Sequence, residues 1–85
     1  MASIETLTLT VTNEANSNFR MSIGARNQVC NLAPDGLAVK AGIQMGDTIL
    51  QLNGSPINGE EELFKMLRAL GVKDDATFVL QRKVH

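Results

Sequence analysis

The 85-residue sequence contains no tryptophan or tyrosine, only one cysteine and two prolines, and no long uninterrupted apolar run. A single cysteine excludes an internal disulfide, so the chain is not a disulfide-stabilised scaffold. No stretch approaches the roughly 20 apolar residues of a membrane span, and the amino terminus lacks the features of a signal peptide. We therefore expect a cytoplasmic protein that does not insert into membranes and meets them only through partners.

The sequence also lacks an excess of charge of one sign. Eight basic residues stand against nine acidic residues, which gives a formal net charge of −1. Such a chain has no overall field to hold nucleic acid or an anionic membrane, so a partner must be recognised locally. The length predicts a single domain over residues 1–85, with a core at about residues 4–83.

Catalytic signatures are missing as well. The only histidine is the last residue, His85, and no metal-ligand cluster or phosphate-binding loop occurs. Cys30 stands between Val29 and Leu32, which favours a small buried strand residue over a reactive thiol. We predict that the chain is not an enzyme and holds no cofactor or metal.

Apolar alternation predicts several short strands. The segment 6–12 places Leu7, Leu9 and Val11 on one face and threonines on the other. Further strands are expected over a segment in which Phe19, Met21 and Ile23 alternate, and over the residues Gln28–Leu32, Thr48–Leu52, a brief segment at Ile57, and Ala76–Arg82. Leu50 is expected to be a core residue of a central strand.

Turn and cap signals predict two helices of different length. Leu37–Ala41 has room for little more than one helical turn before Gly42, which can supply a left-handed cap. A longer helix is expected from Asn58, a good N-cap that pairs with Glu61 in a capping-box pattern, to Gly71. Its apolar stripe consists of Leu63, Met66, Leu67 and Leu70.

The spacing of four small motifs carries a family resemblance. Ala41-Gly42-Ile43, Gly46-Asp47, Ile49-Leu50 and Asn53-Gly54 follow one another as in the middle of PDZ domains, which the chain resembles. The resemblance implies an α+β, mostly β fold, a small antiparallel sandwich or partly open barrel of five to six strands with one short and one long helix. The strand order is similar to that of animal signalling proteins. The permuted order of bacterial proteases fits less well, because residues 6–12 already supply a first strand.

The resemblance also implies a site between the second strand and the long helix. There the carboxyl end of a partner protein adds as a further strand, and loop amides bind its carboxylate. The preferred register places Asn18, Phe19, Arg20 and Met21 on that loop, with Ser22 and Ile23 following; a register at 16–19 is the alternative. Neither of the family's loop glycines is present, and left-handed geometry suits asparagine better than arginine.

Three helix positions face the groove in the family, and here they hold Glu60, Phe64 and Leu67. Phe64 and Leu67, with Phe19, Met21 and Ile23, imply a pocket for an apolar last residue of the ligand. Glu60 offers a carboxylate, which favours a hydroxyl, tyrosine or basic side chain at the third residue from the ligand's end. The opposing explanations are that Glu60 only complements the helix dipole and that Arg20 only faces solvent.

The predicted function is therefore a protein-protein interaction module, a monomer that stands alone or within a multidomain protein, whose partner is a C-terminal peptide. Two alternatives remain open at this point. The first is a regulatory domain of a larger protease that senses exposed chain ends. The second is a structural, dimerising domain whose groove is closed.

Overall fold

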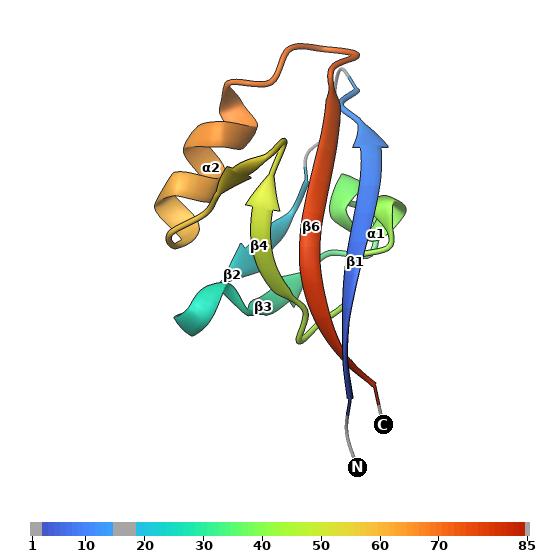
Figure 1. The fold of residues 1–85 in the computed structure, drawn as a ribbon. Coiled ribbons are helices and arrows are strands. Elements are labelled where there is room, and N and C mark those ends of the chain that lie inside the picture. The colour runs from blue at the N-terminus through green and yellow to red at the C-terminus, as the bar shows by residue number, and fades with distance from the viewer. Residues whose placement is uncertain (1–2, 15–18, 85) are drawn as a thin grey trace.

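The computed structural model describes residues 3–14 and 19–84 (Figure 1). It confirms an α+β, mostly β fold with six strands, one short helix and one longer helix. In chain order the elements are β1 (Ser3–Thr12), β2 (Met21–Ile23), a 3-10 turn (Ala25–Asn27), β3 (Val29–Leu32), α1 (Leu37–Ala41), β4 (Thr48–Leu52), β5 (Ser55–Pro56), α2 (Glu60–Arg68) and β6 (Asp75–Val84).

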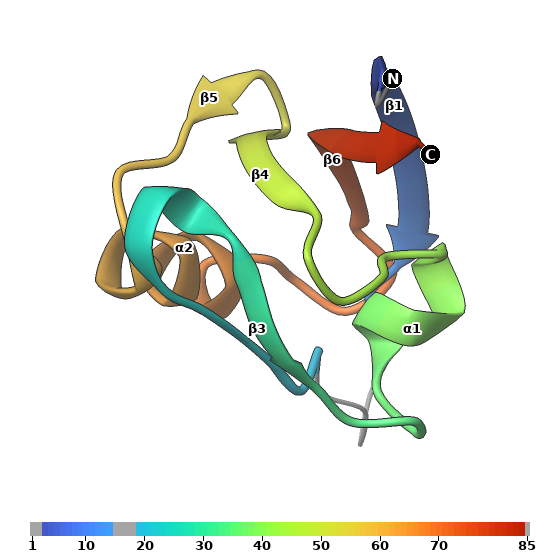
Figure 2. The same cartoon turned by 90° about the horizontal axis from the view of Figure 1, so that it is seen from below.

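The strands form two separate antiparallel sheets. The larger sheet has the order β1-β6-β4-β5, and the smaller one consists of β2 and β3. β1 and β6 pair along their full lengths, from Ser3 opposite Val84 to Thr12 opposite Asp75. Figure 2 shows that α1, α2 and the β2–β3 pair lie on one side of the larger sheet. The threonines of β1 are exposed, as the alternation predicted.

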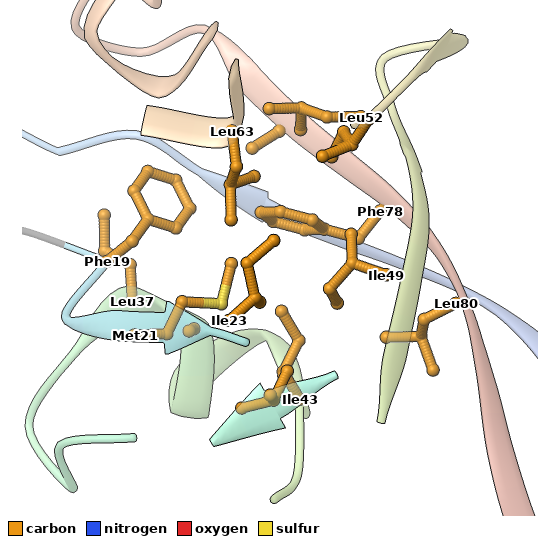
Figure 3. Packing of buried hydrophobic residues seen from close by; sticks show 14 of the residues in the cluster. Phe19, Met21, Ile23, Leu37, Ile43, Ile49, Leu52, Leu63, Phe78 and Leu80 are labelled. Atoms are coloured by element: carbon orange, nitrogen blue, oxygen red, sulfur yellow. The ribbon is translucent and has the colours of Figure 1, made fainter. Parts of the chain in front are cut away.

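The hydrophobic core fills the space between these layers (Figure 3). Phe78 and Leu80 of β6, Ile49 of β4 and Leu63 of α2 are fully buried. The ring of Phe19 packs edge-on against that of Phe78, with 5.8 Å between the ring centroids. The core therefore connects the larger sheet, the long helix and the chain that enters β2.

Local turn chemistry produces the elements around β4 where the sequence predicted them. α1 and β4 have the expected bounds, and Gly42 caps α1 in a left-handed conformation with φ at 101°. Asn53 and Gly54 both have positive φ and form the two-residue turn between β4 and β5. The brief fifth strand is Ser55–Pro56, so Ile57 follows it as a buried core residue.

The bounds predicted for the long helix were wrong at both ends. Gly59, not Asn58, is the N-cap, and the helix ends at Arg68 with Ala69 as its C-cap, before Gly71. The N–H of Gly59 donates to the side chain of Asn27, far away in the sequence. A long-range partner thus replaces the local capping box.

Two predictions of burial were also wrong. Cys30 is exposed, because Val29 faces the core and successive residues of a strand point to opposite faces. Leu50 is only half-buried, because the register of β4 against β6 shifts between Ile49 and Gln51. This irregularity leaves Ile49 and Leu52 as the core residues of β4.

One buried ion pair ties the end of β6 to the turn before β4. The Asp47 carboxylate is almost fully buried, and it accepts from Nε of Arg82 at 2.9 Å and from a terminal guanidinium nitrogen at 2.8 Å. The backbone N–H of Gln44 also donates to Asp47. These hydrogen bonds from Arg82 to Asp47 raise the pKa of Arg82 above its ordinary value, so the guanidinium stays charged.

Candidate functional site

The candidate site begins at the edge of β2 that does not face β3. Within residues 3–14 and 19–84, β3 is the only strand that pairs with β2. The N–H of Ile23 points to the other edge and donates to Oε2 of Glu60 at 3.0 Å. Because alternate residues of a strand direct their backbone groups to the same edge, the backbone of Met21 also faces α2. This edge and α2 are therefore the two sides of the predicted groove.

The loop that leads into β2 has a left-handed backbone at Arg20, the conformation for which the family usually has a glycine. Arg20 has φ at 53°, one of few non-glycine positive values in the described residues. The carbonyls of Phe19 and Arg20 accept from the N–H groups of Ala38 and Ala33 at 3.2 and 3.0 Å. The loop is thus hydrogen-bonded to the first turn of α1 and to the segment before it.

Gly36 is the residue that lets these segments approach so closely. A Cβ on Gly36 would lie 2.5 Å from the carbonyl oxygen of Phe19 and 2.8 Å from Cβ of Arg20. Among the residues that the structure describes, the amide N–H groups of Phe19 and Arg20 donate to no partner. The carbonyls of Phe19 and Arg20 are therefore engaged by the segment around Gly36, which fixes the backbone of this loop.

The predicted groove residues of the loop and strand fall into two groups. Phe19, Met21 and Ile23 are buried in the core, with 7%, 4% and 4% of their surface exposed. Arg20 is exposed, with its guanidinium 3.9 Å from the Asp35 carboxylate, and Ser22 is half-buried. Asn18 and most of the alternative register at 16–19 lie outside the described residues.

The helix positions share one face of α2. Glu60 is the first helical residue, and residues three and four apart lie on the same side, so Phe64 and Leu67 follow it toward β2. Leu67 is half-buried against the core, whereas Phe64 is half-buried but lies outside the core. This placement agrees with a groove position for Phe64.

Two asparagines that sequence reasoning missed hold the ends of α2. Nδ2 of Asn27 donates to the carbonyl of Ile57 at 2.6 Å, and its Oδ1 accepts from the N–H of Gly59 at 2.9 Å. At the other end, Nδ2 of Asn13 donates to the carbonyl of Gly71 at 2.9 Å. Both asparagines stand in polar turns, which gave no sign of their distant partners.

In the described part of the chain, no three histidine, cysteine or acidic side chains gather as a metal site would require. No helix between residues 3 and 84, apart from the undescribed stretch at 15–18, is long and apolar enough to cross a membrane. The site therefore consists of the edge of β2 that faces α2, the helix α2 and the loop that leads into β2.

The sequence model of the PDZ domain family matches residues 6–85. The chain belongs to the PDZ domain family. Members of this family are peptide-binding interaction modules rather than enzymes. A solved PDZ domain from choanoflagellate SHANK1, bound to a GIRK3 peptide, matches with a TM-score of 0.73 and 27% identity, over 96% of this chain and 97% of that chain.

Two curated relatives are similar over part of this PDZ domain. The Na(+)/H(+) exchange regulatory cofactor NHE-RF4 of Mus musculus is 40% identical over 38 residues, which is 45% of this chain. The Partitioning defective 3 homolog B of Homo sapiens is 41% identical over 58 residues, or 65% of this chain. The chain spans only 8% and 5% of the lengths of these relatives.

Proposed function

We propose that this PDZ domain binds the free carboxyl-terminal tail of a partner protein, which adds as a strand between β2 and α2. The observation that carries the proposal is the edge of β2 that faces α2 and not another strand. A strand edge presents N–H and C=O groups that an extended peptide can pair with. The SHANK1 relative, solved with a GIRK3 peptide, supports this class of ligand.

The carboxylate of the ligand is proposed to bind at the loop of Asn18, Phe19, Arg20 and Met21. Consecutive amides that converge in a turn favour an anion. The left-handed Arg20 supplies the geometry that the family obtains from glycine, and its guanidinium adds a positive charge at the rim. Ser22 and Ile23 then continue the strand along which the ligand lies.

The last side chain of the ligand is proposed to be apolar. It would pack on the half-buried Phe64 and Leu67, above the buried side chains of Phe19, Met21 and Ile23. Burial of an aliphatic or phenylalanine side chain contributes about 1.5 to 3 kcal/mol. Because ordering the peptide offsets part of this gain, we expect affinity in the micromolar range.

The third residue from the end is proposed to lie near Glu60 at the start of α2. A carboxylate there favours a hydroxyl, tyrosine or basic side chain and disfavours an acidic one. The domain is further proposed to be a cytoplasmic monomer, in keeping with the exposed free thiol of Cys30. Sedimentation at several concentrations tests the monomer.

The central experiment compares free and amidated peptide ends. A library of peptides with apolar last residues is titrated against the domain and followed by ¹⁵N chemical shifts. We expect micromolar binding of free-carboxyl peptides with the largest shifts at Phe19 to Ile23 and along α2. Equal binding of the amidated peptides, or shifts confined to another face, would overturn the proposal.

A further inference from the structure

One contact in the groove has a consequence for how a ligand enters. Ile23 has a single backbone N–H, and the carboxylate of Glu60 accepts from it at 3.0 Å. An antiparallel strand that adds to this edge of β2 needs the same N–H for its own ladder. In the free domain, the Glu60 side chain thus occupies the Ile23 N–H that the proposed function requires for the ligand.

The backbone around Glu60 is fixed, so the helix start is not free to move away from β2. Asn27 binds both the carbonyl of Ile57 and the N–H of Gly59, the residue before Glu60. Asn27 itself follows β2 in the chain, in the 3-10 turn. The distance between β2 and the start of α2 is therefore set by Asn27, and a rotation of the Glu60 side chain is the movement that frees Ile23.

The displaced carboxylate needs a new partner. Among the described residues, the ion pairs join Arg20 to Asp35, Lys40 to Glu14 and Arg82 to Asp47, and none includes Glu60. A hydrogen bond that involves an ionised group is about twice as strong as a neutral one. A lysine or arginine on the ligand compensates Glu60 better than a hydroxyl does.

On the basis of the proposed function, we propose that Glu60 is a latch on the peptide-binding edge and that binding is an exchange. In the free domain the Glu60 carboxylate holds the Ile23 N–H. The ligand strand takes over that N–H, and a cationic side chain at the third residue from the ligand's end takes over the carboxylate. Ligands without such a side chain bind more weakly because they leave Glu60 without its partner. Glu60 therefore determines ligand specificity through the hydrogen bond to Ile23 that it gives up, in addition to any direct contact with the ligand.

The latch itself is tested without any ligand, by amide hydrogen exchange. We expect the Ile23 amide to exchange about tenfold faster in Glu60→Ala than in the wild type, since it loses its acceptor. The matched control is Glu61→Ala, which removes the same charge from the same helical turn at an exposed residue. The amide of Leu80 in β6 reports any global loss of stability. An unchanged Ile23 rate in Glu60→Ala would overturn the latch.

The exchange with ligand is tested with two free-carboxyl peptides that differ only in lysine or alanine at the third residue from the end. The wild type is expected to prefer the lysine peptide. Glu60→Ala is expected to bind the alanine peptide about threefold to tenfold more tightly than the wild type does and to lose the preference for lysine. Glu61→Ala is expected to behave as the wild type does.

The outcomes separate the latch from the function on which it rests. If amidated peptides bind as well as free ones, the proposed function fails and the latch has no ligand to gate. If free-carboxyl peptides bind the wild type but Glu60→Ala weakens both peptides equally, the latch fails and the proposed function stands. If the wild type binds the lysine peptide and Glu60→Ala gains affinity for the alanine peptide, the latch and the proposed function are both supported.

Discussion

The four-stranded sheet and the groove between β2 and α2 are held by different interactions. In the sheet, β1 and β6 pair over ten residues each, and Ile49, Phe78 and Leu80 are fully buried. In the groove, β2 has three residues, and side chains that bind distant backbone groups position the helix. These side chains are Asn13, Asn27 and Glu60.

The difference indicates which part of the PDZ domain resists change and which part adjusts. Deleting a buried apolar side chain typically costs 2 kcal/mol or more, whereas a net hydrogen bond contributes only about 0.5 to 1.5 kcal/mol. A rotation of Glu60 is therefore an accessible movement, while a rearrangement of the sheet is not. Substitutions in the two regions should separate stability from binding.

The largest expected effect is that of Phe78→Ala in the sheet. This change removes a fully buried ring and its edge-on contact with Phe19, so the free energy of unfolding should fall by about 3 to 5 kcal/mol. Urea denaturation followed by circular dichroism measures the loss. Phe78→Leu serves as a milder variant if the alanine variant does not fold. A loss below 1 kcal/mol in Phe78→Ala would contradict the position of the core.

Substitutions at two neighbouring residues of β4 test its register. Ile49→Ala should cost about 2 to 5 kcal/mol, because Ile49 is fully buried. Leu50→Ala should cost clearly less, because Leu50 is half-buried at the irregularity of the strand. The same denaturation measurement compares the two, and a larger loss at Leu50 would show that the register of β4 is different.

Gly36→Ala connects the two regions. The added Cβ would lie too close to the carbonyl oxygen of Phe19, so the loop of Phe19 and Arg20 must shift, at a cost of about 1 to 3 kcal/mol. We expect chemical-shift changes centred on Phe19 and Arg20 and weaker binding of free-carboxyl peptides. Gly46→Ala is the control. Its added Cβ meets no atom within 4 Å, but the positive φ of Gly46 disfavours alanine, so this variant is destabilised without a clash at the loop. If only Gly46→Ala weakens binding, Gly36 does not support the loop.

The smallest effect on stability is expected for Phe64→Glu in the groove. Phe64 lies outside the core, so the free energy of unfolding should change by less than about 1 kcal/mol, while peptide affinity should fall by about tenfold. Isothermal titration calorimetry and thermal denaturation measure the two quantities. Ala69→Glu, at the exposed C-cap of α2, is the control. A large drop in melting temperature would place Phe64 in the core instead.

Local signals in the sequence were sufficient for much of the fold. The bounds of α1 and β4, the left-handed Gly42 and the Asn53-Gly54 turn depend on neighbouring residues, and all were predicted. The predictions that failed, at Cys30, Leu50 and the helix caps, depend on how strands pair and on what approaches from elsewhere.

The sequence by itself determined the PDZ fold class and the order of the elements, because turn chemistry, apolar periodicity and the spacing of the PDZ-like motifs are local signals. The residues of the groove came from the resemblance to the family and stay a prediction. The tertiary structure alone decided which distant side chains hold these elements together: Asn27 on the start of α2, Glu60 on the Ile23 N–H, and the Arg82 and Asp47 pair between β6 and the turn before β4. Each of these contacts joins residues more than 30 positions apart. No local pattern specifies such a partner, because the partner is brought near only when the core has packed.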